Sequence, residues 1–269
     1  MTESLRKRII TAVIVAVLFL GVLFFLPPVA TVIVLTALVL AGAWEWSAFL
    51  RATRARARAA YVVLVGLLLP AAWSITAAPD ALRVILLTAL AWWVVALAWI
   101  IFAPRNVAPW SAGLAGVLAL VPAWLALVRL LDVPHGAHWV LFTLLLVWSA
   151  DIGAYFAGHR FGRTRLAPEV SPGKTWEGVI GGFALSAVVA VAGSAWFALP
   201  LYSFVPLCLA AVAFSIVGDL TESLLKRFAG VKDSGTLFPG HGGVMDRIDS
   251  VTGAAPVLFF GLTILGVIA

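Results

Sequence analysis

Long apolar runs dominate the chain, and short polar or basic segments separate them. A helix needs about 20 apolar residues to cross the hydrocarbon core of a bilayer, and most of the runs approach or exceed that length. They predict about nine transmembrane helices, over residues 9–26, 29–50, 61–77, 82–102, 110–131, 139–157, 178–199, 203–218 and 250–268. We therefore expect an all-α polytopic membrane protein.

The first apolar run follows Arg6-Lys7-Arg8, an order that also occurs in cleavable signal peptides. The run is long for a signal peptide, and a second apolar run follows almost at once. We expect the first run to be retained as a transmembrane helix.

Composition supports a membrane protein and excludes several other classes. Hydrophobic residues make up 63% of the 269 residues and charged residues 11%, with a mean hydropathy of +1.10. A soluble domain has about a quarter charged residues, and a disordered chain is far less apolar. The single Cys excludes a disulfide framework and a cysteine-built zinc site.

The distribution of positive charge predicts the orientation in the membrane. The net charge is +6, but the basic residues form short clusters between apolar runs, which does not favour nucleic-acid binding. With nine spans, all Lys and Arg except Arg83 and Arg129 lie on the side of the N-terminus. Because basic loops stay in the cytoplasm, we expect a cytoplasmic N-terminus, an external C-terminus and residence in the inner membrane.

No internal repeat or long linker divides the chain, so residues 1–269 are expected to form one membrane-embedded domain. Residues 1–105 hold the first four spans, and residues 106–269 hold the last five with the polar cytoplasmic loops. Glu45, between two Trp residues near the inner interface, is interpreted as structural.

The end of the eighth span carries an unusual set of polar residues. If that helix continues beyond Gly218, then Asp219, Glu222, Ser223 and Lys226 share one face. Glu222 and Lys226 could be a simple surface ion pair. An acid at the position of Asp219 is costly without a partner, which favours a cation beside it.

A glycine-rich segment, Pro239-Gly240-His241-Gly242-Gly243, follows Lys232 and Asp233. Glycines permit unusual backbone angles, and the N–H groups of such a loop can bind an anion. Asp246 and Asp249 lie at the start of the ninth helix, where they could be either helix caps or metal ligands. Carboxylates among so many cations fit Mg²⁺ bound together with substrate phosphates.

Two further features lie in the sixth and seventh spans. Asp151 is an acid within an apolar run and therefore a site candidate. The sequence Ser171-Pro-Gly-Lys174-Thr175-Trp-Glu177 offers donors for phosphate, but it is not a P-loop, because Pro168 stands where the first glycine belongs. Ala150, Ala154 and Gly158 have the spacing of a close helix–helix contact.

The segment 223–249 resembles the signature of phosphatidate cytidylyltransferases, and every fixed position is filled. The matching residues run Ser223-x-Leu225-Lys226-Arg227-x4-Lys232-Asp233-x-Gly235-x2-Phe238-Pro239-x-His241-Gly242-Gly243-Val244-x-Asp246-Arg247-Ile248-Asp249. The stretches 151–158 and 171–178 are also similar to that family, except that Gly173 replaces a usual Lys. The resemblance covers roughly the C-terminal half.

The resemblance implies that CTP and phosphatidate give CDP-diacylglycerol and diphosphate, with Mg²⁺ as cofactor. It also implies a homodimer and a second cation, K⁺, near the Mg²⁺. We predict catalytic roles for Asp219, Asp246, Lys226 and Lys232, and metal ligation by Asp219, Asp246, Asp249 and Asp151. Substrate contacts are predicted for Ser171, Lys174, Thr175, Glu177, Ser223, Arg227, Asp233, His241, Gly242, Gly243 and Arg247.

Two other functions are compatible with a polytopic chain of this kind. A CTP-dependent lipid kinase would phosphorylate a polyprenol and would need a base to activate the alcohol. A transporter would also have many spans and intramembrane acids, but here the acids gather at one face and no inverted repeat is visible.

Overall fold

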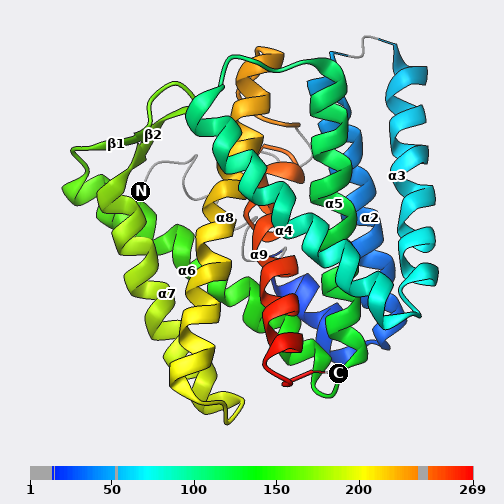
Figure 1. Cartoon of the computed structure of the whole chain (residues 1–269), viewed down its shortest axis with the longest axis vertical. Helices are drawn as coiled ribbons and strands as arrows, with labels where there is room; N and C mark the ends of the chain where they lie inside the picture. The colour runs from blue at the N-terminus through cyan, green and yellow to red at the C-terminus, as the bar shows by residue number, and fades with distance from the viewer. Residues whose placement is uncertain (1–13, 15, 52–53, 236–241, 269) are drawn as a thin grey trace.

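The structure is a computed structural model that describes residue 14 and residues 16–51, 54–235 and 242–268. An apolar helix, Ala16–Phe25, comes first. It is followed by α2 (Pro28–Trp46), the 3-10 turn η1 (Ser47–Leu50), α3 (Ala55–Ile75), α4 (Pro79–Phe102), α5 (Pro109–Asp132), α6 (Gly136–Phe161), β1 (Arg165–Ala167), β2 (Ser171–Thr175), α7 (Trp176–Trp196), α8 (Leu201–Ala229) and α9 (Met245–Ile264). The fold is a helical bundle with one small hairpin (Figure 1).

Eight helices in the described part of the chain are long and apolar enough to cross a membrane, which confirms an all-α polytopic protein. The predicted first span lies partly outside the described residues, and its described part is the shorter helix Ala16–Phe25. Large apolar side chains are exposed along many of the helices, as expected for surfaces that face lipid.

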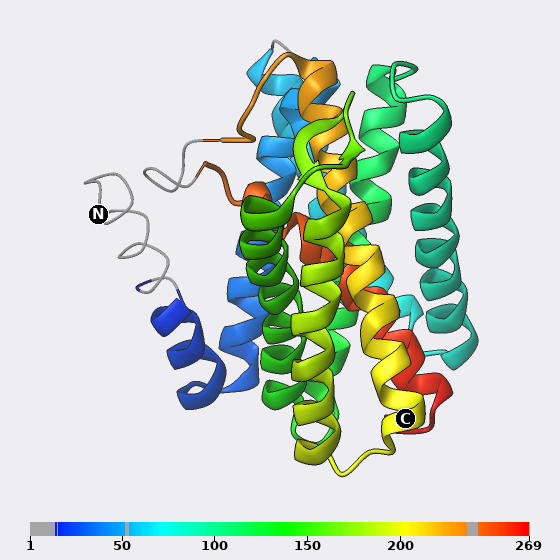
Figure 2. The same cartoon turned by 90° about the vertical axis from the view of Figure 1, so that its left-hand side faces the viewer.

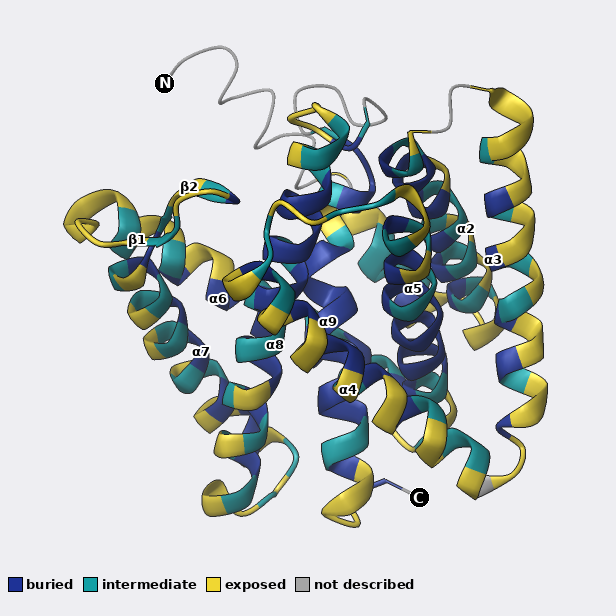
Figure 3. Cartoon of the chain, turned by 45° about the horizontal axis from the view of Figure 1, so that its top comes forward, coloured by how far each residue is buried: buried dark blue, intermediate teal, exposed yellow. Residues whose placement is uncertain are grey.

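Helices α5 and α9 form the centre of the bundle. Both are mostly buried, whereas much of α3 is exposed (Figure 3). Helix α5 packs against α2, α3, α6 and α9, and α9 also packs along α8. The start of α9 is thereby held next to the core instead of at the periphery.

The connections of the bundle gather at two ends (Figure 1). The links η1–α3, α4–α5 and α8–α9, together with the β1–β2 hairpin, lie at one end, and the links α3–α4, α5–α6 and α7–α8 lie at the other. The basic segments 54–58, 160–174 and 226–232 therefore occur at the same end of the molecule. Which side of the membrane this end faces stays a prediction.

The apolar pattern of the sequence predicts helices alone and no strands. Instead, β1 and β2 pair as antiparallel strands, with Arg165 opposite Thr175 and Ala167 opposite Ser171. Thr175 then ends the hairpin and caps α7, accepting a hydrogen bond from Gly178 N at 3.1 Å through Oγ1. The hairpin thus fixes Lys174 next to the first turn of a helix.

Close contact between α6 and α7 sets the position of this hairpin (Figure 2). A Cβ atom on Gly153 would lie 2.3 Å from Gly181 O, and one on Gly182 would lie 2.8 Å from Ala150 O. Gly178 similarly faces Ala154 O. The small-residue spacing in α6 therefore does serve helix packing, as the sequence indicates.

Candidate active site

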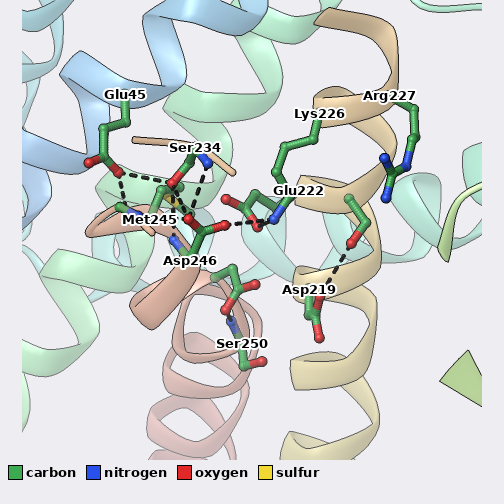
Figure 4. Close-up of polar contacts among 12 residues, drawn as sticks. Glu45, Asp219, Glu222, Lys226, Arg227, Ser234, Met245, Asp246 and Ser250 are labelled. Carbon is green, nitrogen blue, oxygen red and sulfur yellow. Dashed lines mark hydrogen bonds and ion pairs between the residues drawn. The ribbon is translucent and has the colours of Figure 1, made fainter. Parts of the chain in front are cut away.

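The polar residues that the sequence predicts on one face of the eighth span lie on α8 (Figure 4). The helix continues to Ala229, so the predicted extension beyond Gly218 is confirmed. Asp219, Glu222 and Lys226 share that face, and Ser223 Oγ lies 3.4 Å from Asp219 Oδ1. Asp219 and Lys226 are separated by two turns, and their surroundings differ.

Lys226 lies between two carboxylates. Its Nζ is 2.6 Å from Glu222 Oε2 and 2.7 Å from Asp246 Oδ1. The Glu222 side chain is fully buried, so this is a buried ion pair, and the surface-pair interpretation is wrong. One ammonium group thus joins α8 to the start of α9.

Asp246 forms hydrogen bonds with the segment before α9, of which the structure describes residues 230–235 and 242–244. Its Oδ2 accepts hydrogen bonds from Gly243 N at 2.8 Å, Ser234 N at 3.1 Å and Ser234 Oγ at 2.9 Å. Gly242 has φ +79°, and a Cβ atom on it would lie 2.4 Å from Asp246 Oδ2. Glycine is therefore required there both for its backbone angle and for space.

A cavity of about 560 Å³ opens between α6, α7, α8 and the hairpin. Three charged residues of the predicted site line it: Asp151 from α6, Lys174 from β2 and Asp219 from α8. Lys174 Nζ and Asp219 Oδ2 form an ion pair. Tyr155, His159 and Arg165, which were not predicted, line the same cavity, whose volume suits a nucleotide-sized ligand.

Asp249 lies where α9 touches α8. Its side chain is buried, and its Oδ1 accepts a hydrogen bond from Ser250 N at 2.7 Å. A Cβ atom on Gly218 would lie 2.5 Å from Asp249 O, so α8 and α9 touch here through their backbones.

The oxygen donors at this crossing suit a hard divalent cation. Glu222 Oε1 is buried without a hydrogen-bond partner among the described residues. In that part of the chain, no three His, Cys, Asp or Glu residues form a metal site by themselves. Mg²⁺ commonly uses only one or two carboxylates, with phosphate oxygens and water as further ligands, so the donor set fits Mg²⁺ bound with a nucleotide.

Other predicted site residues lie elsewhere. Arg227 lines a second cavity of about 410 Å³ with Arg51, Arg105 and Glu169. The Glu177 carboxylate accepts hydrogen bonds from Thr164 N and so fastens the hairpin. Ser171 is half-buried at the start of β2, whereas Lys232, Asp233 and Arg247 are exposed near the segment before α9, and His241 lies outside the described residues.

Two residues of the Asp246 network were missed as functional candidates. Ser234 was not considered, and Glu45 was interpreted as structural. Glu45 is buried on α2 and contacts Ser234 and the first residues of α9. A carboxylate inside an apolar run is itself a signal of function, and it was available in the sequence.

The chain is similar to known cytidylyltransferases over most of its length. The model of the cytidylyltransferase family matches residues 6–265. A phosphatidate cytidylyltransferase of Pseudomonas aeruginosa is 42% identical over 261 residues, covering 94% of this chain and 95% of that protein. The enzyme of the same name from Haemophilus influenzae is 38% identical over 278 residues, with 94% and 96% covered, and the one from Bacillus subtilis is 41% identical over 140 residues, about half of each chain.

Proposed function

Because the chain belongs to the cytidylyltransferase family, we propose that it transfers the cytidylyl group of CTP to phosphatidate. The products are CDP-diacylglycerol and diphosphate. The observation that carries this conclusion is the similarity to phosphatidate cytidylyltransferases along almost the whole chain. The relatives named above are phosphatidate cytidylyltransferases, neither lipid kinases nor transporters.

The reaction needs positioning and charge neutralisation more than it needs a base. A phosphate oxygen of phosphatidate forms a bond to the α-phosphorus of CTP, and the bond from that phosphorus to the bridging oxygen breaks. The electron pair leaves with diphosphate. Because the phosphatidate phosphate is already anionic at neutral pH, the main barrier is repulsion between two phosphate groups.

The two lysines near the acidic groups are suited to that task. Lys174 and Lys226 both pair with carboxylates, and each has further N–H donors that could contact phosphate. We propose that Lys174 contacts the triphosphate in the 560 Å³ cavity, where Asp151 and Asp219 also lie. Lys226 would hold Asp246 in place and neutralise charge at the α8–α9 crossing.

We propose Mg²⁺ as the cofactor, held by Asp219 and Asp246 with Asp249 and Asp151 as further ligands. When bound, it would neutralise charge on the phosphates. The donor chemistry described above and the buried Glu222 Oε1, which has no hydrogen-bond partner among the described residues, support this assignment. K⁺ as a second cation and a homodimeric assembly belong to the same proposal and rest on the resemblance alone.

We further propose that the protein lies in the inner membrane of a bacterial cell and that its site faces the cytoplasm. Most of the basic residues lie at the end of the bundle that carries the hairpin and the segment before α9. A site there receives CTP from water and phosphatidate from the bilayer. The amphiphilic acceptor explains why the site lies within a membrane bundle.

The product identifies the function directly. Purified protein is incubated in detergent–lipid micelles with CTP labelled at the α-phosphate and with phosphatidate, and lipid-extractable label is measured. We expect labelled CDP-diacylglycerol and free diphosphate, lost with EDTA and restored by Mg²⁺. Formation of labelled CDP from CTP and polyprenol, with no labelled lipid, would instead identify a kinase.

A further inference from the structure

Glu45 is a buried carboxylate on α2 that contacts the segment carrying Asp246 (Figure 4). Its Oε1 accepts a hydrogen bond from Val244 N at 3.0 Å, and its Oε2 accepts one from Met245 N at 2.8 Å. N–H groups at the start of a helix have no carbonyl partner within that helix. Glu45 therefore caps α9, although it belongs to α2 and lies 199 positions before Val244 in the chain.

Ser234 connects Glu45 with Asp246. Ser234 Oγ lies 3.0 Å from Glu45 Oε2 and 2.9 Å from Asp246 Oδ2. A hydroxyl group has a single proton, so it donates to one of these carboxylates at a time while remaining close to both. The position of Asp246 thus depends on Glu45 in two ways, through the start of α9 and through this hydroxyl group.

Two glycines make room for the Glu45 carboxylate. A Cβ atom on Gly235 would lie 2.2 Å from Glu45 Oε1, and one on Gly243 would lie 2.2 Å from Glu45 Oε2. Neither glycine has the positive φ that would demand glycine for conformational reasons. Their small size serves to admit the Glu45 side chain, which otherwise could not reach the backbone N–H groups.

We infer that Glu45 is a positioning residue for nucleotidyl transfer, which holds the start of α9 so that Asp246 stays next to Lys226. The inference rests on the proposed function for its effect on turnover. Two backbone N–H groups donate to the buried carboxylate, the Ser234 hydroxyl group lies 3.0 Å from it, and its negative charge lies at the helix end that favours an anion. No contact with substrate is required for this role.

The first test compares Glu45→Gln with Thr36→Val. A glutamine has the same size but only one acceptor oxygen, so its NH₂ group would face either Val244 N or Met245 N. Thr36 lies on the same helix, and its Oγ1 accepts a hydrogen bond from Trp124 Nε1 of α5 at 2.9 Å. Thr36→Val thus controls for a general weakening of the α2 contacts.

Two readouts separate positioning from stability. We expect Glu45→Gln to lower kcat about tenfold to a hundredfold and to raise the Mg²⁺ concentration for half-maximal activity, with a smaller change in KM for phosphatidate. Amide hydrogen exchange of residues 242–250 should become faster in Glu45→Gln and stay unchanged in Thr36→Val. Equal effects of both substitutions, or unchanged exchange in Glu45→Gln, would overturn the inference.

A double-mutant cycle tests the contact itself. Gly235→Ala alone should accelerate exchange of residues 242–250, because the new methyl group displaces the carboxylate. In a Glu45→Ala background the same substitution should add little, because the nearest atoms that it meets all belong to Glu45. Additive effects would contradict the contact.

Exchange is measured without substrate, so this test does not depend on the proposed function. A wild-type protein that makes no CDP-diacylglycerol would refute the proposed function and leave the test of the Glu45 contact intact.

Discussion

At the scale of single residues, acids and lysines form pairs that hold the site in a defined arrangement. Asp246 uses one oxygen for Lys226 and the other for three donors of the preceding segment. Lys174 pairs with Asp219 across the cavity. Each of these contacts uses a carboxylate or an ammonium group. We therefore expect even the replacement of a carboxylate by an amide at these positions to lower activity strongly.

Asp246→Asn is expected to lower kcat/KM by more than about a hundredfold while the protein remains folded in detergent. The new NH₂ group cannot accept a hydrogen bond, so it would oppose either Lys226 Nζ or the Gly243 and Ser234 donors. Turnover and melting temperature are measured together. Asp132→Asn, at the opposite end of the bundle, is the control and should retain its activity; near-normal turnover of Asp246→Asn at low Mg²⁺ would exclude Asp246 as an essential ligand.

Lys174→Ala is expected to lower kcat/KM for CTP by about tenfold to a hundredfold, which corresponds to about 1.5–3 kcal/mol for a charged contact. The substitution removes a proposed phosphate contact and also leaves Asp219 without its ion-pair partner. Arg163→Ala is the matched control, because Arg163 is exposed outside the cavity-lining residues. Small and equal effects of the two substitutions would show that Lys174 contributes only general positive charge.

At the scale of elements, glycines and alanines determine how closely the helices approach. In α6 and α7 they allow backbone contact, which places the hairpin and Lys174 over the cavity. In α8 and α9, a Cβ atom on Gly253 would lie 2.1 Å from Phe214 O, and Gly218 similarly faces Asp249. The distance between the acids of the site is therefore set by helix packing.

Gly181→Ala tests this role of close packing. The added methyl group would lie 2.2 Å from Ala157 Cβ and 2.7 Å from Gly153 O, so α6 and α7 must separate. We expect a loss of about 1–3 kcal/mol in stability, seen as a lower melting temperature in detergent, and reduced turnover. Gly66→Ala in α3 meets only Leu40 Cδ2, at 3.5 Å, and should leave both quantities unchanged; equal losses in the two variants would contradict the packing argument.

At the scale of the whole molecule, the bundle has one end rich in positive charge and polar structure and one end with little of either. The hairpin and the segment before α9 belong to the first end (Figure 1). Exposed apolar side chains cover much of the bundle between the two ends, as lipid contact requires. The proposed site at this end would thus be open to one substrate from water and to another from the bilayer.

Labelling of introduced cysteines tests the proposed orientation. The native Cys208 is buried, so a membrane-impermeant maleimide should report mainly on the new position. We expect Arg56→Cys to react in inverted inner-membrane vesicles and not in intact spheroplasts, because it lies at the basic end. Arg83→Cys, near the start of α4, should show the opposite pattern, and the reverse result for both would place the site outside the cytoplasm.

Much of this protein follows from its sequence. The hydrophobic runs predict the spanning helices, because a bilayer requires long apolar segments whose backbone hydrogen bonds are internal. The segment 223–249 and its similarity to a known signature predict the family, and spacing along one helix predicts that Asp219, Glu222 and Lys226 share a face. These features depend on residues that are near one another in the chain.

Only the tertiary structure decides which distant residues meet. Glu45 reaches the start of α9, Lys174 pairs with Asp219 through a hairpin that the sequence did not predict, and Arg227 lines a separate cavity despite being next to Lys226. Sequence periodicity defines a helix face, but it does not define what packs against that face. That choice is made by the shapes of helices that approach one another at glycines, and it turns separate polar segments into a candidate active site.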